Sequence, residues 1–412
     1  MDHRITAARL ATMLVLFCNG LLYATWGVSV PLIKERFQAS DGLLSLAMAA
    51  VAVGGIATMA AAGRWIARAG SGRASLHSGL LMALAAAPIL LVPGYSALLA
   101  LLFAYGIAAA ANDVAANAQV AHLERLSGRS LIGSVHGSFS AGGLIGALIA
   151  GAWAASSLPA AANFLALAAC VAVAMLLAAR HLINEPAAEA AASPAPGDAL
   201  PVPDGLVRRR LRLFGVLAFT ALVVEGAFYD WAAVYMKEVA RAPASWVGLG
   251  YAAFAIAMAA GRLGGDWLRD RYPHQTVIAG SGIVGMGGLA IVLANASPAA
   301  VVAGFLVTGL GLSNIIPVLF SSAGRLSTEA GWSASQGLAV TTRIAYAGLL
   351  AGPLLIGPVA ELVGLRLSLL SLIGAIATTC GGWLLLSRAN AGAPWRITVA
   401  PQPTGVIRQQ HP

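Results

Sequence analysis

Runs of apolar residues, each long enough for a membrane-spanning helix, fill most of this 412-residue chain. A helix needs about 20 apolar residues to cross the hydrocarbon core of a bilayer. Short polar stretches separate the runs, so the pattern predicts twelve transmembrane helices. They lie near residues 10–33, 43–63, 74–93, 96–121, 132–155, 160–182, 211–236, 244–264, 275–294, 298–323, 334–360 and 365–387. In the tenth run, Asn314 and Pro317 predict a break in the helix.

The runs form two groups of six. The stretch from Asn184 to Val207 is rich in Ala, Pro, Glu and Asp, which is typical of an extended linker. We therefore expect an all-α membrane protein with two pseudo-symmetric six-helix bundles. The expected parts are an N-terminal bundle (1–182), a cytoplasmic linker (183–210), a C-terminal bundle (211–388) and a cytoplasmic tail (389–412).

Composition agrees with a membrane protein rather than a soluble one. Apolar residues make up 59% of the chain and charged residues only 10%, whereas soluble domains carry about a quarter charged residues. The 47 glycines fit close helix packing in lipid. Cys18, Cys170 and Cys380 lie far apart in apolar runs, with no spacing typical of a metal or redox site, and we expect no cofactor.

The net charge of +9 reflects membrane topology rather than a nucleic-acid partner. The basic residues do not cluster on a polar segment with interleaved aromatics. With the N-terminus cytoplasmic, nineteen of the 25 Lys and Arg residues fall on the cytoplasmic side and five on the other, with Arg343 inside a helix. The positive-inside rule then places both termini in the cytoplasm. High Arg, Ala and Gly content suggests a bacterial inner-membrane protein.

The two halves repeat weakly, and the repeat is parallel. Tyr23-Ala-Thr-Trp-Gly and Tyr229-Asp-Trp-Ala take matching places in the first helix of each half, and Gly63-Arg64 matches Gly261-Arg262. Two bundles related by an axis along the membrane normal suit alternating access to a central cavity.

The loop after the eighth run reads Gly261-Arg-Leu-Gly-Gly-Asp-Trp-Leu-Arg-Asp-Arg271. It resembles the signature loop of the major facilitator superfamily, and the six-plus-six pattern extends this resemblance over the whole chain. The resemblance implies a charge latch between helix ends at the cytoplasmic gate. The latch residues it implies are Arg262, Asp266, Asp270 and Arg271. The equivalent loop of the first half, from Gly63 to Arg73, lacks the acid.

Asp113-Val-Ala-Ala-Asn117 resembles the Glu-x-Ala-Ala-Asn pattern of the fucose/proton symporter family, with Ala118 where that family has a proline. The resemblance implies that Asp113 carries the proton. That family also has an acid in its first helix, whereas no ionisable residue lies between Arg9 and Lys34 here. The sugar specificity of the family therefore does not follow.

Ionisable groups inside apolar helices are costly and usually face a cavity or a partner. A carboxyl group shielded from water can exchange a proton near neutral pH, so Asp113 is a candidate proton carrier; alternatively, it pairs with His136 or Arg343. We interpret His136 as a proton relay or a packing residue, and Arg343 as an anion-binding or charge-neutralising residue. Glu225 is a candidate ligand for a substrate hydroxyl or cation, and Asp230 an outer-gate or interfacial residue.

The expected function is proton-coupled secondary active transport of a small polar organic solute, for which a sugar is one candidate. The expected substrate-binding residues are Asn19, Tyr23, Trp26, Asn117, Glu225, Tyr229, Asn314 and Arg343, and the proton-coupling residues are Asp113 and His136. The alternative is an exporter of metabolites or drugs by proton antiport. A sensor would need a larger folded cytoplasmic domain. The sequence contains no nucleotide-binding loop, so it predicts neither an ATP-driven pump nor another enzyme. The expected partners are the solute, protons and the lipid bilayer, with the chain a monomer.

Overall fold

A computed structural model describes residues 3–128, 131–184, 205–331 and 334–389, and these are almost entirely helical. The first half contains α1 (His3–Phe37), α2 (Asp41–Ala69), α3 (Ser71–Ala86), α4 (Tyr95–Ser127), α5 (Ile132–Ala154) and α6 (Ala160–Ala179). The second half contains α8 (Gly205–Glu238), the 3-10 turn η1 (Ala244–Trp246), α9 (Val247–Arg271), α10 (His274–Ala294), α11 (Pro298–Leu312), α12 (Ile315–Glu329), α13 (Ala334–Val363) and α14 (Leu365–Ala389). The predicted tail and most of the predicted linker lie outside the described residues, and α8 already begins at Gly205.

The twelve predicted segments are all present as helices in the described part of the chain. Eleven are long and apolar enough to cross a membrane, α11 and α12 together forming one of them. The predicted break at Asn314 is confirmed, since Ser313 and Asn314 separate those two helices. The third segment is shorter than expected: α3 ends at Ala86 because Pro88, which has no backbone N–H, begins a turn.

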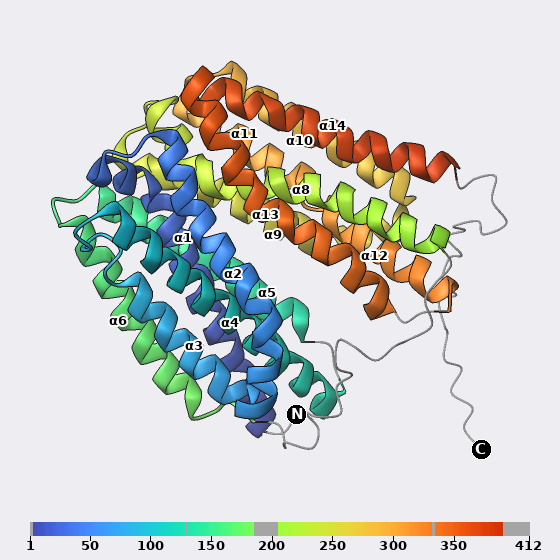
Figure 1. Ribbon diagram of the computed structural model, residues 1–412, viewed down its shortest axis with the longest axis horizontal. Coiled ribbons are helices and arrows are strands. Elements are labelled where there is room, and N and C mark those ends of the chain that lie inside the picture. The colour runs from blue at the N-terminus through green and yellow to red at the C-terminus, as the bar shows by residue number, and fades with distance from the viewer. Residues whose placement is uncertain (1–2, 129–130, 185–204, 332–333, 390–412) are drawn as a thin grey trace.

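The helices form two bundles that meet at one end and diverge at the other (Figure 1). Helices α1 to α6 make the N-terminal bundle, and α8 to α14 make the C-terminal bundle. The bundles contact each other chiefly through α2 with α13, α5 with α9 and α1 with α8. We call the end where the bundles meet the closed end, and the end near both chain termini the open end.

The same close packing recurs in both bundles, as the parallel repeat predicts. In the N-terminal bundle α1 packs along α5, and in the C-terminal bundle α8 packs along α13. A Cβ added at Gly142 would press against the carbonyl oxygen of Phe17, and one at Gly348 against that of Phe219. Glycine is required at both places because the helix backbones touch there.

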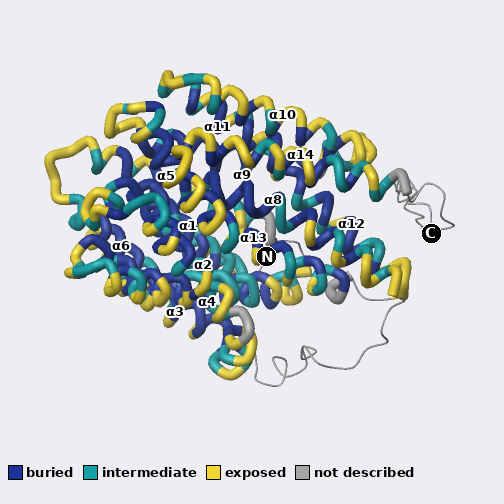
Figure 2. Tube along the Cα trace, turned by 45° about the horizontal axis from the view of Figure 1, so that its top comes forward, coloured by how far each residue is buried: buried dark blue, intermediate teal, exposed yellow. Residues whose placement is uncertain are grey.

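The outer surface of the bundles is apolar. Buried residues line the inner faces of the helices, while exposed residues follow their outer faces (Figure 2). Many of the exposed side chains are large and apolar, such as Leu84 at 69%, Leu263 at 72% and Leu362 at 85% exposure. An aqueous protein rarely exposes so much apolar surface. The chain is therefore a multi-pass membrane protein whose outward faces meet lipid.

Candidate functional site

A central cavity lies where the two bundles face each other. Its volume is about 450 Å³, within the range of pockets that hold small organic ligands. Helices α1, α2, α4 and α5 supply one wall, and α8, α9 and α13 supply the other. The polar and aromatic side chains on it are Asn19, Tyr23, Trp26, Asp113, Phe139, Asp230, Arg262 and Tyr346. The cavity thus brings together residues more than 300 positions apart.

Asp113 reaches this cavity from α4 and is half-buried. No Lys or Arg of the described chain lies within ion-pair distance of its carboxylate. One turn further on, the Asn117 side-chain amide donates to the Asp113 backbone carbonyl at 2.9 Å. The Asn117 side-chain oxygen lies 2.9 Å from Nε2 of His136, whose side chain is exposed. Of the partners expected for Asp113, neither Arg343 nor His136 forms an ion pair with it.

Asn19 places an amide from α1 at the edge of the same wall. Its Nδ2 donates to the side-chain oxygen of Asn112 and to the backbone carbonyl of Ala109, both at 3.1 Å. Asn112 in turn donates to the Ser75 carbonyl at 3.0 Å. Asn112 therefore points into the N-terminal bundle, and its neighbour Asp113 points into the cavity. A chain of amide hydrogen bonds holds α1, α3 and α4 together behind Asp113.

The opposite wall contains an ion pair. Arg262 of α9 donates from Nη2 to Oε1 of Glu225 in α8 at 2.8 Å. The Glu225 side chain is only 11% exposed, whereas the Arg262 side chain is 43% exposed. Five residues further along α8, the half-buried Asp230 also lines the cavity. Its place in the cavity differs from the expected interfacial position.

Aromatic rings from both bundles form the closed-end floor of the cavity. Tyr23 and Tyr229, which the repeat predicts to be equivalent, meet across the bundle interface with ring centroids 6.5 Å apart in a T-shaped contact. Tyr229 also contacts Tyr251 at 5.3 Å and Phe254 at 5.1 Å. Beside them, the predicted residue Trp26 is only 2% exposed. These rings offer flat apolar faces with a few polar atoms, which suits a small polar organic ligand.

The predicted cytoplasmic latch is corrected at Arg262. This arginine faces the cavity and binds Glu225 of α8. Helix α9 continues through the loop to Arg271, which turns Arg262 toward α8 rather than toward Asp270. Asp270 and Arg271 are exposed and form no ion pair with another residue of the described chain. The side chain of Asp266 lies outside the described residues.

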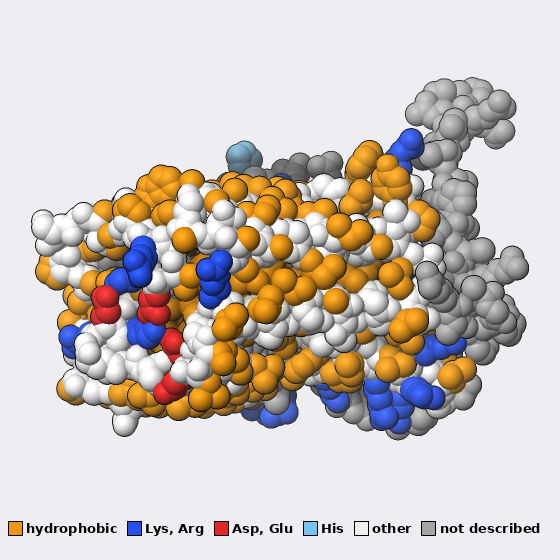
Figure 3. All heavy atoms as spheres, turned by 90° about the horizontal axis from the view of Figure 1, so that it is seen from above, with side chains coloured by type: hydrophobic (Ala, Val, Ile, Leu, Met, Phe, Trp, Pro, Cys, Tyr) orange, Lys and Arg blue, Asp and Glu red, His pale blue; other side chains and the backbone are white. Residues whose placement is uncertain are grey.

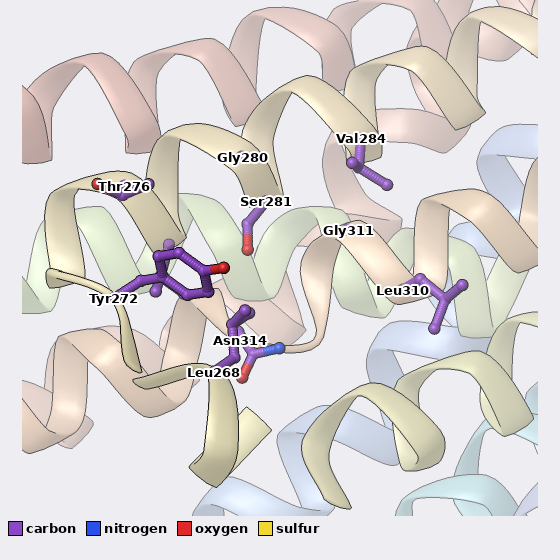
Figure 4. Close-up of a pocket in the computed structure, with 10 residues that line it drawn as sticks. Leu268, Tyr272, Thr276, Gly280, Ser281, Val284, Leu310, Gly311 and Asn314 are labelled. Atoms are coloured by element: carbon purple, nitrogen blue, oxygen red, sulfur yellow. The ribbon is translucent and has the colours of Figure 1, made fainter. Parts of the chain in front are cut away.

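Asn314 lines a different space from the one expected. It belongs to a cleft of about 470 Å³ between the end of α9, α10 and α11, where its side chain lies near Tyr272 and Ser281 (Figure 4). Its side-chain oxygen accepts a hydrogen bond from Arg269 at 2.7 Å, and its amide donates to the Gly261 carbonyl at 3.1 Å. Asn314 therefore fixes the helix break against α9. Arg343 likewise does not line the cavity; it is exposed on α13 and binds neither Asp113 nor Glu225.

Sequence reasoning missed a group of charged residues at the closed end. Lys34 and Glu35 end α1, while Lys237 and Glu238 end α8, and the two dipeptides bind each other across the bundle interface. A signal was available, because Lys34 and Lys237 are the only lysines in the chain and each is followed by glutamate.

Comparison with known proteins supports the fold and the family. The family model of the Major Facilitator Superfamily matches residues 12–331. An uncharacterised MFS-type transporter of Yersinia pestis is 31% identical, covering 92% of this chain and 94% of its own length. Membrane protein MosC of Rhizobium meliloti is 30% identical, with coverage of 92% and 90%.

Solved structures of transporters share the fold at low sequence identity. The nucleoside transporter NupG superposes with a TM-score of 0.74 at 12% identity, covering 94% of this chain and 99% of NupG. A bacterial homologue of the human lysosomal transporter Spinster, in an inward-facing unoccupied conformation, gives a TM-score of 0.73 at 14% identity, with coverage of 97% and 100%. The predicted twelve-helix architecture is therefore confirmed.

Proposed function

Because this chain belongs to the Major Facilitator Superfamily, we propose that it is a proton-coupled secondary active transporter. It moves a small polar organic solute across the bacterial inner membrane by alternating access to the central cavity. The observation that carries the proposal is the environment of Asp113: a half-buried carboxyl group that lines the cavity and forms no ion pair with any Lys or Arg that the structure describes.

Asp113 is suited to carry the proton because its carboxylate forms no ion pair in the described chain. The carboxylate of Glu225, by contrast, already forms an ion pair with Arg262. The side-chain amide of Asn117 donates to the backbone carbonyl of Asp113, and His136 contacts the other side of that amide, its oxygen. We assign Asp113 as the proton carrier, with His136 reaching it through Asn117. The resemblance of Asp113–Asn117 to the fucose/proton symporter pattern supports the same role.

We assign the solute to the remaining polar and aromatic residues that line the cavity, and to Tyr229 and Glu225, which contact the lining residues Tyr23 and Arg262. Asn19 offers an amide edge, the aromatic rings of Tyr23, Trp26 and Tyr229 offer flat faces, and the Glu225–Arg262 pair offers both an acceptor and a donor. Such a mixture binds hydroxyl and amine groups on a compact ring or chain. A sugar is one solute of this kind.

Surface charge supports the proposed orientation. Basic side chains cluster near the end with the chain termini, acidic and basic side chains mix at the opposite end, and apolar side chains separate the two (Figure 3). The positive-inside rule places the basic end in the cytoplasm. In this orientation the open end of the cavity faces the cytoplasm, and the closed end faces outward.

The test is a thermal-shift screen of the purified protein against sugars, nucleosides, amino acids and common drugs, at pH 5.5 and pH 7.5. A ligand at about 100 times its Kd stabilises the protein by roughly 2.7 kcal/mol, which a melting curve resolves. Hits are then tested in proteoliposomes for accumulation driven by a pH gradient. The proposal predicts a polar hit that accumulates with protons; a hit that only equilibrates, whatever the gradient, would contradict proton coupling.

Asp230 favours a second function, export by proton antiport. It gives the cavity a second carboxyl group with no cationic partner in the described chain. A cationic solute could then displace a proton from either acid, so that solute and proton move in opposite directions. In the same proteoliposomes, antiport would appear as solute gradients that drive protons the opposite way, with hits limited to organic cations.

A further inference from the structure

The two lysines of the chain form reciprocal ion pairs between the bundles. Lys34 Nζ lies 2.7 and 2.8 Å from the two carboxylate oxygens of Glu238, and Lys237 Nζ lies 2.6 Å from Oε1 of Glu35. Each dipeptide lies in the last turn of the first helix of its bundle. Each bundle thus gives one cation and one anion to the other.

We propose that Lys34, Glu35, Lys237 and Glu238 form the outer gate of the transporter, which we call the lysine–glutamate latch. It holds the closed end shut while the cavity is open to the cytoplasm, and it must separate for the cavity to open outward. This assignment rests on the proposed alternating access, but it concerns conformation and can be tested without a substrate.

An apolar layer lies between the latch and the cavity. Ala24 and Val28 of α1, Ala147 and Ala150 of α5, and Tyr251, Ala252 and Ala255 of α9 form one buried cluster. Helices α5 and α9 come so close that a Cβ added at Gly248 would lie 2.7 Å from the carbonyl oxygen of Ala147. This layer excludes water from the cavity, and the latch lies beyond it, where the charges reach solvent.

The two pairs differ in exposure, so their contributions differ. The side chains of Lys34 and Glu238 are 18% and 37% exposed, while those of Lys237 and Glu35 are 32% and 60% exposed. Exposed ion pairs are weak, and burial strengthens them. Lys34 also binds Asp41 of its own bundle at 2.6 Å. The Lys34 pair is therefore the stronger one, and the Lys237 pair is the simpler one to manipulate.

The chemistry of the latch suits a gate that opens repeatedly. When the bundles separate, each keeps one lysine and one glutamate side by side, so neither bundle exposes a net charge. Lys34 also keeps Asp41 as a partner. On opening, the lysine and glutamate side chains exchange their protein partners for water, because they lie at the membrane surface. A pair buried in lipid would carry a much larger desolvation penalty.

A further contact links the bundles at the same end. Glu361, near the end of α13, accepts hydrogen bonds from the Ser40 hydroxyl at 3.1 Å and from the Gly42 backbone N–H at 3.0 Å. Both donors lie at the first turn of α2, where backbone N–H groups favour an acidic partner. The closed end is thus held at α1–α8 and at α2–α13.

Carbodiimide crosslinking tests the latch directly, because this reagent joins an amine and a carboxylate that are already in contact. With only two lysines, the crosslinked peptides are unambiguous in mass spectrometry. The Lys34–Asp41 crosslink within the N-terminal bundle forms in either state and serves as an internal reference. We expect the Lys34–Glu238 and Lys237–Glu35 crosslinks beside it. The reference crosslink without either inter-bundle crosslink would overturn the proposal.

Charge exchange tests whether the latch controls opening. Spin labels at Ser157 and Ala244, both exposed at the closed end, report the distance between bundles after Cys18, Cys170 and Cys380 are replaced. We expect E35K to raise the population of the long distance roughly two- to fivefold, which corresponds to losing one exposed ion pair. The double variant E35K/K237E should restore the short distance.

R36E is the matched control, because Arg36 is the neighbouring cation and contacts only its own bundle, at Phe37 and Val92. If E35K and R36E change the distance equally, or if E35K/K237E does not restore it, the lysine–glutamate pairing does not control the gate. The proposal would also be contradicted if the distance distribution in E35K were the same as in the wild type. A larger population of the long distance in 1 M salt, where charges are screened beyond about 3 Å, would support the proposal.

Discussion

The two walls of the cavity are each held by a contact between two helices, but the contacts differ in chemistry. Asn19 lies four residues before Tyr23 on α1, and Glu225 lies four residues before Tyr229 on α8. Asn19 binds a second amide, Asn112, whereas Glu225 binds the guanidinium of Arg262. Each contact joins the first helix of a bundle to a neighbouring helix. The N-terminal wall is held by neutral groups, and the C-terminal wall by an ion pair.

This difference favours Asp113 over Glu225 as the proposed proton carrier. The Glu225–Arg262 ion pair joins α8 to α9, so a proton that displaced Arg262 from Glu225 would break this contact. Asp113 stands beside the neutral contact and takes no part in it, since Asn112 rather than Asp113 faces the bundle interior. Protonation of Asp113 can then change the cavity without loosening the bundle.

Breaking the ion pair is expected to have the largest effect on stability. R262A leaves the Glu225 carboxylate, only 11% exposed, without its partner. We expect it to destabilise the protein by about 2–3 kcal/mol, because a buried charge loses its charge-assisted hydrogen bond. The melting temperature in detergent measures this. The double variant E225Q/R262A should recover part of the loss, and equal melting of R262A and wild type would refute the structural role of the pair.

Breaking the amide contact is expected to cost less. N19A leaves the side-chain oxygen of Asn112 without a donor, while Asn112 keeps its own hydrogen bond to Ser75. An unpaired neutral acceptor costs about 1–2 kcal/mol, less than an unpaired charge. The same melting assay should therefore rank N19A between R262A and wild type. If N19A melted below R262A, the two walls would not differ as described.

Neutralising Asp113 is expected to have the smallest effect on stability. D113N keeps the shape of the side chain and removes a charge that no cation of the described chain balances. We expect a change within about 0.5 kcal/mol, the range of substitutions that break no specific contact. D230N, on the opposite wall, is the matched control. A large loss of stability in D113N alone would show that Asp113 has a structural partner.

Much of the fold could be predicted because it depends on local pattern. The apolar runs, the six-plus-six division and the break at Asn314 all follow from residues close together in the sequence. The end of α3 was predicted too late because Pro88 sits inside an apolar run, where hydropathy continues although the helix does not.

The site was harder to predict because its contacts join distant residues. Asp113, Asn19, Tyr23 and Trp26 do line one cavity. Arg262, however, was assigned to a latch from its neighbours in the loop, and its partner Glu225 lies 37 residues away on another helix. Nothing local indicates which way an arginine turns at a helix end. The Lys34–Glu238 pair spans 204 positions, and only the repeated Lys-Glu dipeptide pointed to it.

The most direct test of the central claim compares two transport modes of D113N in proteoliposomes, with a solute found in the thermal-shift screen. Exchange of labelled for unlabelled solute needs binding and alternating access but no net proton movement. Accumulation under a pH gradient needs all three. The account predicts that D113N keeps exchange and loses accumulation, whereas D230N keeps more of both. If D113N retained full pH-driven accumulation, Asp113 would not be the proton carrier.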